Sequence, residues 1–335
     1  MSQRIIVKIG SSSLTRSNGG LNREKINYFA GEIATLRHNG YEILLVSSGA
    51  VAAGFGPVGY PSRPKLLAEK QASAAVGQAL LMQAYSEAFG RHDIKVAQIL
   101  LTRSNFSNRH QALNAMLTME ELLNKRIVPI INENDTVSVD ELKFGDNDTL
   151  SALVANLVKA HRLLIFTDTD GLYTDNPRVN PDAKQIRHVE KIDEQLFKMA
   201  GEAGSSVGTG GMRSKIEAAR IAVRGGIPVF IGQAAEPEDM LHAVQGDGKG
   251  TYFDTPLQKL PIKKQWVGFH SIPKGRITVD AGAEDAILNR GKSLLPAGVI
   301  DSVGEFHPGD VVEVYNTDKE LIGKGVVNYT SWQLQ

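Results

Sequence analysis

Near its start the chain reads Arg4-Ile5-Ile6-Val7-Lys8-Ile9-Gly10, a short run of mainly β-branched residues that ends at a glycine. Such a run is typical of a buried strand that enters a turn. Apolar residues then recur at helical spacing from Glu24 to His38, with Asn22 as the predicted N-cap. The apolar run Ile43–Val46 follows, and it is typical of a strand that is covered on both faces. These segments predict a strand, a helix and a second strand in succession.

The same alternation continues to about residue 255. It predicts helices over about 65–90, 109–124, 148–160 and 212–224, and strands over 95–101, 127–131, 163–167 and 228–231. Strands that alternate with helices build a mostly parallel sheet with helices on both faces. The sequence therefore predicts an α/β fold, an αβα sandwich with a mostly parallel central sheet.

The pattern changes after about residue 255. Short alternating segments such as Arg276–Val279 and Val311–Val314 are typical of strands, and one short helix is predicted near Glu284–Arg290. We therefore expect a first domain over residues 1–255, a linker over 256–273 and a small, mainly β domain over 274–335.

The composition excludes several classes of protein. The 37 basic and 37 acidic residues leave no formal net charge, which argues against electrostatic binding to nucleic acids or membranes. The chain has no cysteine, so it has no disulfides, no thiolate chemistry and no cysteine-ligated zinc. Its apolar runs are too short to span a membrane and its start lacks the regions of a signal peptide, so we expect a cytoplasmic protein.

Small, polar or acidic residues follow four of the predicted strands. They are Gly10–Ser13, Ser47–Ala50, Asn132–Asp135 and Asp168–Gly171. Any one of these segments alone is more readily explained as a turn or a helix cap. Because ligands gather outside the carboxyl ends of the strands in such a sheet, the four together predict a binding site at one edge.

Two glycine-rich segments are predicted to be turns and not phosphate sites. Gly54–Gly59 fits the pattern G-x-G-x-x-G, but Pro57 and Pro61 stand where the helix of a dinucleotide site should begin. Gly291-Lys292-Ser293 is similar to the end of a P-loop, but Ala286 occupies the position of the earlier glycine.

A third glycine-rich segment fits an anion site better. Gly208–Lys215 runs directly into a predicted helix, whose N-terminus and free backbone N–H groups favour an anion. The alternative is a flexible loop with a solvated lysine. Lys8 also favours an anion site, because a lysine in an apolar strand is costly to bury without an anionic partner. The alternative explanation for Lys8 is that its aliphatic side chain extends to the edge of the sheet, where the ammonium group reaches solvent.

Five motifs taken together resemble the amino acid kinase superfamily, and within it the glutamate 5-kinase family. They are Lys8–Ser12, Ser47–Ala50, Ile131–Asp135, Gly145–Asp148 and Gly208–Lys215. The resemblance spans residue 4 to about residue 255, and the segment from about Lys274 resembles a PUA domain. The chain ends at Gln335, which leaves open whether the PUA-like domain is whole.

The resemblance implies transfer of phosphate from ATP, with Mg²⁺, to the γ-carboxylate of L-glutamate, the first step toward proline. It implies a homo-oligomer, a dimer or tetramer, that proline inhibits. A glutamate side chain has a pKa near 4.3, so it is ionised at neutral pH and needs no general base. The main obstacle is then the repulsion between this carboxylate and the phosphate.

The resemblance also assigns roles to single residues. Lys8, Lys215 and Asp168 are expected to be catalytic, with Asp168 orienting both lysines. Glutamate is expected to be held by Ser48, Asp135, Asp146 and Asn147, of which Asp146 is a candidate for the α-amino group. The ATP site is expected to comprise Lys8, Thr167, Asp168, Thr209, Gly210, Gly211, Met212, Arg213, Ser214 and Lys215. No protein ligand is assigned to Mg²⁺, which is expected mainly through the phosphates of ATP. Asp148 and Thr149 are interpreted as caps of the helix that follows.

Two alternatives stay open. One is another acid kinase of the superfamily, with aspartate or acetylglutamate as its acceptor. The other is an RNA-binding protein that acts through the PUA-like segment, although basic and acidic residues balance over 257–335.

Overall fold

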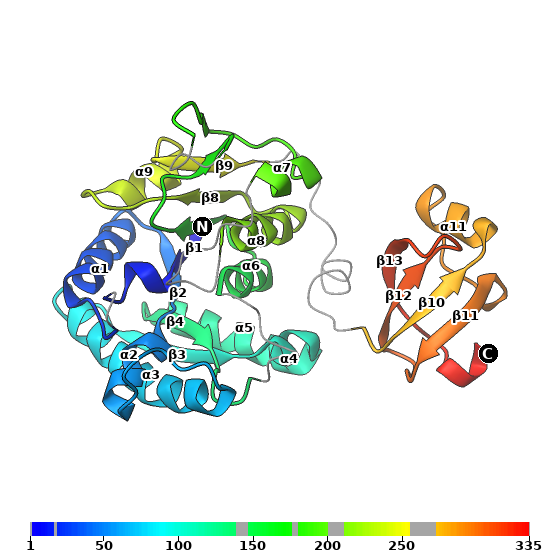
Figure 1. Cartoon of the computed structure of the whole chain (residues 1–335), viewed down its shortest axis with the longest axis horizontal. Coiled ribbons are helices and arrows are strands. Elements are labelled where there is room, and N and C mark those ends of the chain that lie inside the picture. The colour runs from blue at the N-terminus through cyan, green and yellow to red at the C-terminus, as the bar shows by residue number, and fades with distance from the viewer. Residues whose placement is uncertain are drawn as a thin grey trace. The chain divides into compact units, whose positions relative to one another are not determined.

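The computed structural model describes residues 2–16, 19–138, 147–175, 180–199, 211–254 and 273–334. The chain divides into two compact units, the first formed by most of the chain up to Lys259 and the second chiefly by Leu260–Gln335. Figure 1 shows each unit with its own set of strands and helices.

The larger unit is built on a seven-stranded sheet. Its strands lie in the order β3 (Val96–Leu101), β4 (Val128–Glu133), β2 (Glu42–Val46), β1 (Arg4–Ile9), β5 (Arg162–Phe166), β8 (Val229–Gly232) and β9 (Gly250–Phe253). Every neighbouring pair is parallel except β8 and β9, which are antiparallel. The predicted α/β fold with a mostly parallel sheet is confirmed.

Five helices confirm the sequence patterns. They are α1 (Arg23–His38), α3 (Leu67–Gly90), α5 (Arg109–Asn124), α6 (Asn147–Leu157) and α8 (Met212–Arg224). Asn22 caps α1 as predicted, because its side-chain oxygen accepts a hydrogen bond from the Lys25 amide. Shorter elements were not expected from the sequence: η1 (Ser11–Ser13), α2 (Ala50–Val58), α4 (Arg103–Ser107), β6 (Leu172–Tyr173), β7 (Gln185–Ile186), α7 (Glu194–Met199) and α9 (Asp239–Gln245).

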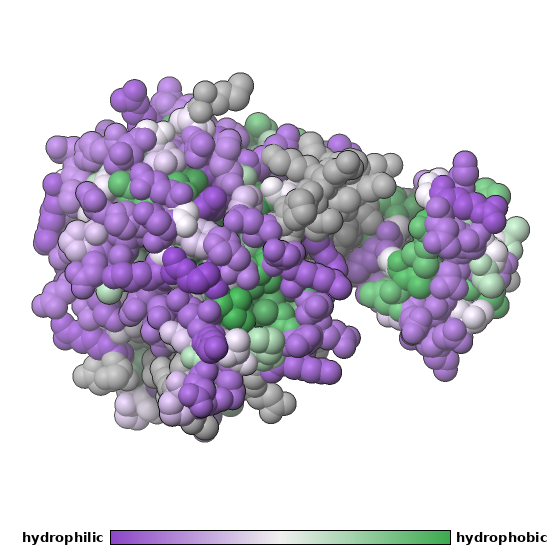
Figure 2. Space-filling model, turned by 90° about the horizontal axis from the view of Figure 1, so that it is seen from above, coloured by the Kyte–Doolittle hydropathy of each residue, from purple (hydrophilic) through white to green (hydrophobic). Residues whose placement is uncertain are grey.

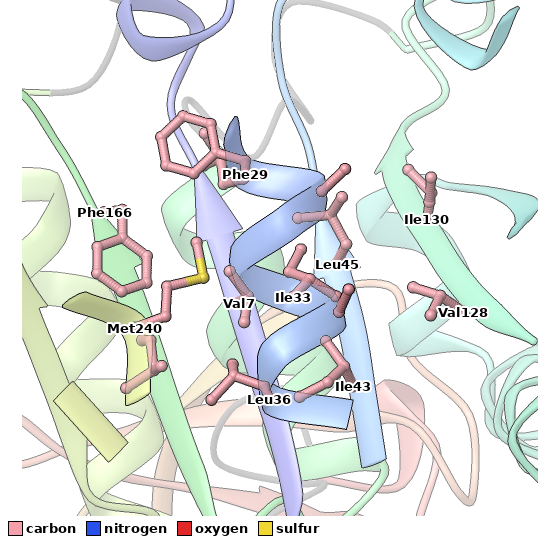
Figure 3. Packing of buried hydrophobic residues seen from close by; sticks show 14 of the residues in the cluster. Val7, Phe29, Ile33, Leu36, Ile43, Leu45, Val128, Ile130, Phe166 and Met240 are labelled. Atoms are coloured by element: carbon pink, nitrogen blue, oxygen red, sulfur yellow. The ribbon is translucent and has the colours of Figure 1, made fainter. Parts of the chain in front are cut away.

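The two faces of the sheet have different neighbours. On one face Val7 of β1 packs into a core that contains residues of α1, α3 and α9, and Figure 3 shows Val7 beside Phe29, Ile33 and Leu36 of α1. Successive side chains of a strand point to opposite faces, so Lys8 points to the other face. There α6 packs against β1 and against α8. The alternation along β1 therefore directs one lysine toward the start of α6.

The prediction that Gly54–Gly59 forms a turn is wrong, because most of this segment belongs to α2. Gly54 packs against Gly77 of α3 so closely that a Cβ atom at Gly54 would lie 1.9 Å from the carbonyl oxygen of Ser73. A Cβ at Gly77 would lie 1.8 Å from the carbonyl oxygen of Ala50. These glycines let two helices approach, and α2 ends one residue after Pro57. Packing against α3 outweighs the poor helix propensity of glycine.

The smaller unit has a four-stranded sheet in the order β11 (Val299–Gly304), β10 (Gly275–Val279), β12 (Val311–Tyr315) and β13 (Leu321–Val326). Ile277, Val279, Phe306, Val312, Val314 and Val327 form its buried core. The predicted strands and the predicted short helix, α11 (Ala281–Leu288), are confirmed. Gly291 follows this helix with a positive φ of 60°, as the predicted turn requires.

Hydrophilic residues cover most of the face of the larger unit that Figure 2 shows. Within the described ranges, no helix is both long enough and apolar enough to cross a membrane.

Candidate functional site

The carboxyl ends of the central strands meet at one edge of the sheet, as predicted. Strand β1 lies between β2 and β5, with Lys8 beside Val46 on one side and beside Ile165 on the other. The polar segments after β2 and β4 therefore lie on one side of Lys8, and Thr167 and Asp168, which follow β5, lie on the other. The strand order changes direction at β1, which is where ligands bind in sheets of this kind.

Lys8 and Lys215 contact the same buried carboxylate, that of Asp148. Both lysines are almost fully buried, and Asp148, the second residue of α6, is 0% exposed. Lys8 Nζ forms an ion pair with Asp148 Oδ1, and Lys215 Nζ lies 3.1 Å from Asp148 Oδ2. The expectation that Lys8 needs an anionic partner to be buried is confirmed, and the partner is a protein side chain.

The carboxylate that contacts both lysines in this structure is that of Asp148, and the orienting role expected of Asp168 stays a prediction. Asp168 is exposed, and its Oδ1 accepts a hydrogen bond from Thr167 Oγ1 at 3.0 Å. Asp148 was predicted only as a cap of the helix that follows. An acidic residue in the first turn of a helix is ordinarily explained by capping and by the helix dipole, so no local pattern indicates that Asp148 is buried against Lys8.

The amide of Asn147 is the centre of a second group of contacts. Three oxygen atoms surround its Nδ2: the Ser47 carbonyl at 2.6 Å, Asn132 Oδ1 at 2.7 Å and Ser48 Oγ at 2.9 Å. Ser48 and Asn132 are themselves buried. The structure thus brings together two of the residues predicted to hold glutamate, Ser48 and Asn147, and adds Asn132, which the prediction left out.

Asp135, predicted for the same pocket, is half-buried just beyond the end of β4. That strand continues through Asn132 and Glu133, so these two residues belong to the strand and not to the loop that the sequence suggested. Glu133 Oε1 accepts a hydrogen bond from Ser138 Oγ at 2.8 Å, which ties the loop after Asp135 back to the strand. Asp146 lies outside the described residues.

The glycine-rich segment leads into α8, as predicted. Gly211 is the N-cap of this helix, and Met212, Arg213, Ser214 and Lys215 form its first turn. Ser214 Oγ lies within hydrogen-bond distance of Asp148 Oδ2, at 3.0 Å, and the Arg213 guanidinium lies 5.9 Å from the ring centre of Phe197. Thr209 and Gly210 lie outside the described residues. The start of α8 is thereby fixed to the start of α6 through Asp148.

The described part of the site offers positive charge and hydrogen bonds. Among the described residues, no three histidine, aspartate or glutamate side chains are grouped so that they could hold a metal ion. Two buried ammonium groups are donors that can form charge-assisted hydrogen bonds with an anionic ligand. The two lysines and Asp148 thus lie where β1 separates the polar segments after β2 and β4 from those after β5, and α8 begins beside Asp148.

Comparison with solved structures shows the same fold. Carbamate kinase from Giardia lamblia bound to AMP-PNP is 16% identical and superposes with a TM-score of 0.56 over 76% of this chain and 99% of its own. Isopentenyl phosphate kinase is 20% identical and gives a TM-score of 0.53 over 75% of this chain and 100% of its own. At these identities the likeness shows the fold alone.

Sequence comparison is more specific. A glutamate 5-kinase from Bacillus cereus (strain ATCC 10987 / NRS 248) is 51% identical over 99% of this chain and 91% of its own. A glutamate 5-kinase from Geobacillus kaustophilus is also 51% identical, over 99% of this chain and 89% of its own. The amino acid kinase family matches residues 3–233, and the PUA domain matches residues 275–335. The chain therefore belongs to the amino acid kinase family and, within it, to the glutamate 5-kinase family.

Proposed function

We propose that this chain transfers the γ-phosphoryl group of ATP to the γ-carboxylate of L-glutamate, which gives L-glutamyl 5-phosphate and ADP. The observation that carries the proposal is the pair of buried lysines that contact one carboxylate. They lie between the β2 and β4 side of β1, which we assign to the acceptor and call the acceptor side, and the β5 side, which we assign to the nucleotide. The name of the full-length relatives supports glutamate as the acceptor.

The reaction needs charge stabilisation more than proton transfer. An oxygen of the ionised γ-carboxylate attacks the γ-phosphorus of ATP, and the bond from that phosphorus to the bridging oxygen of ADP breaks. No proton has to be removed from the nucleophile, since the carboxylate is already ionised at neutral pH. Lys8 and Lys215 stabilise the negative charge on the transferred group from two directions. Asp148 keeps both ammonium groups in place before the substrates bind.

The remaining roles divide between the two sides of β1. Ser48, Asp135, Asp146 and Asn147 hold glutamate in this proposal, and the Ser48–Asn147 hydrogen bond supports a common pocket. The nucleotide is held by Lys8, by Thr167 and Asp168 after β5, and by residues before and at the start of α8: Thr209, Gly210, Gly211, Met212, Arg213, Ser214 and Lys215. The N-terminus of α8 supports this, because free N–H groups at a helix start favour phosphate.

Mg²⁺ would enter this site with ATP. It takes oxygen ligands and is commonly bound by substrate phosphates with only one or two carboxylates. Asp148 is a fully buried carboxylate that contacts two lysines, whereas Asp168 is an exposed carboxylate in the proposed nucleotide site. Asp168 fits Mg²⁺ as a direct or water-mediated ligand, and the ion would supply neutralisation of phosphate charge.

A coupled assay of ADP release over a panel of acids tests the function. Glutamate, aspartate, acetylglutamate and carbamate are each supplied with ATP, with and without Mg²⁺. We expect glutamate to be the preferred acceptor and ADP release to require Mg²⁺. A preference for aspartate or acetylglutamate would overturn the proposal.

Further properties follow from the same family membership and are proposed with it. They are a kinase domain over 1–255, a linker over 256–273, a PUA-like domain over 274–335, a cytoplasmic location, a dimer or tetramer, and inhibition by proline. The two compact units and the two family matches support the division of the chain. Expression of residues 1–255 tests it, and we expect a folded fragment with glutamate-dependent ADP release. Light scattering of the full chain tests the oligomer, and a proline titration tests the inhibition.

A further inference from the structure

A buried glutamine of α3 is connected to the acceptor side through one intermediate residue. Gln78 is 9% exposed, and its Oε1 accepts a hydrogen bond from Asn132 Nδ2 at 2.8 Å. Its own Nε2 donates to Oε1 of Gln98 on β3 at 2.9 Å. Among the described residues, Gln78 is the acceptor for the amide nitrogen of Asn132. A glutamine in this position is costly to bury unless both ends of its amide are paired, as they are here.

The contact with Gln78 determines what Asn132 presents to Asn147. Asn132 Oδ1 accepts from Asn147 Nδ2 at 2.7 Å and from the Glu133 amide at 2.9 Å, while its Nδ2 points to Gln78. If the Asn132 amide turned over, its NH₂ group would face the NH₂ group of Asn147, and two donors would oppose each other. Without an acceptor at position 78, the buried Asn132 NH₂ group would be unpaired, and the side chain would gain by turning away.

We propose that Gln78 is a positioning residue for the phosphoryl acceptor: it holds Asn132 in the orientation that fixes the amide of Asn147 for glutamate. This inference rests on the proposed function, because it assigns Asn147 to the glutamate pocket. Gln78 acts through Asn132, and the direction of the hydrogen bonds runs from Asn147 to Asn132, to Gln78 and to Gln98. A residue on the edge strand β3 is thereby connected to the acceptor pocket.

Steady-state kinetics of the full chain test the inference. Gln78→Met keeps the length of the side chain and removes both amide groups, whereas Gln78→Glu keeps an oxygen that can accept from Asn132. We expect Gln78→Met to raise the KM for glutamate about tenfold, with the KM for ATP and kcat within about twofold of the parent, since about 1.4 kcal/mol corresponds to a factor of ten. Gln78→Glu should recover most of the affinity for glutamate. Gln83→Met is the matched control, because Gln83 is an exposed glutamine of the same helix that contacts Glu87.

The outcomes separate this inference from the proposed function. An unchanged KM for glutamate in Gln78→Met overturns the inference, and so does an equal loss in Gln78→Glu and Gln78→Met. If Gln78→Met does not fold, Gln98→Leu is the variant to measure. Gln98 is exposed, and its loss removes the acceptor of Gln78 Nε2. An unchanged KM for glutamate in Gln98→Leu then overturns the inference. If the parent chain prefers another acid, the proposed function fails, and the same comparison is made with the KM for that acid.

Discussion

The role of Asp148 is the most direct test of how the site is built, and Asp148→Asn is the substitution that probes it. The side chain keeps its size, but the negative charge between Lys8 and Lys215 is lost. Both lysines are at least 94% buried, so neither ammonium group would find compensation in solvent. We expect the variant to fold less stably and to phosphorylate glutamate far more slowly.

The expected size follows from the geometry. At 3.1 Å, the attraction between Lys215 Nζ and Asp148 Oδ2 is about 5 kcal/mol with an effective dielectric constant of about 20. The cost of burying Asp148 offsets part of this attraction, and removal of one partner from a buried ion pair typically costs about 3–5 kcal/mol. That loss lowers the Tm of the larger unit by about 10 °C. Turnover should fall by about 10²–10³, the range for loss of one preorganised charge-stabilising group.

ATP should reverse part of the stability loss, which distinguishes this explanation from simple damage to the core. The phosphates bring the negative charge that the variant lacks, and a ligand that binds only the folded state raises stability. Thermal unfolding with and without ATP should therefore show a larger upward shift in Asp148→Asn than in the parent chain. Asp239→Asn is the control, since Asp239 is a buried carboxylate that accepts from the Ala235 and Glu236 amides, away from the site. Parent-like stability and an equal ATP shift in Asp148→Asn would refute the reasoning.

Three further predictions concern other links between sequence and function. Lys8→Ala and Lys215→Ala should each lower kcat by about 10²–10³ while the binding of ATP, measured by calorimetry, weakens much less; near-normal turnover in either variant would contradict its assigned role. Gly77→Ala should destabilise by about 1–3 kcal/mol in urea unfolding because its Cβ would lie 1.8 Å from a carbonyl oxygen of α2, whereas Gly90→Ala, where the Cβ meets open space, should not destabilise. Burial raises the pKa of Glu32, whose carboxylate accepts from the Glu238 and Met240 amides, so the folded chain binds more protons there than the unfolded chain. The stability that this carboxyl group contributes at low pH is therefore lost as the pH rises through its raised pKa. The difference in unfolding free energy between the parent and Glu32→Gln should fall as the pH rises above about 4.5, the ordinary value, and a constant difference would contradict this explanation.

Much of the fold was predictable because the dominant signals are local. The apolar run of β1 and the helical spacing of α1 both follow from the burial of one face of an element, and the N-cap at Asn22 is set by a contact three residues away. The alternation of strands and helices then limits the sheet to a mostly parallel arrangement. The edge on which the site lies followed from that arrangement without any knowledge of side-chain contacts.

The features that the sequence did not predict depend on contacts between distant segments. Helix α2 contains glycines and a proline, which locally favour a turn, and it forms because Gly54 packs directly on Gly77 of α3. Gln78 likewise accepts its hydrogen bond from Asn132, which lies 54 positions further along the chain. No local pattern reports a contact of this kind, because the partner that satisfies the glycine or the amide comes from another element.

The carboxylate that contacts the two lysines is a further case in which local sequence patterns do not report a contact between distant segments. The resemblance to the family assigned the orientation of both lysines to Asp168, and Asp148 was predicted only as a helix cap. The alternation along β1 favours Asp148 instead: Val7 packs toward α1, so Lys8 must point to the face that α6 covers. Asp148, at the start of α6, is buried on that face of the sheet. Asp168, which follows the end of β5, is exposed. Asp148 is therefore buried against both lysines, whereas Asp168 is exposed, and this difference in burial is the reason why we propose Asp168, and not Asp148, for the nucleotide and its Mg²⁺.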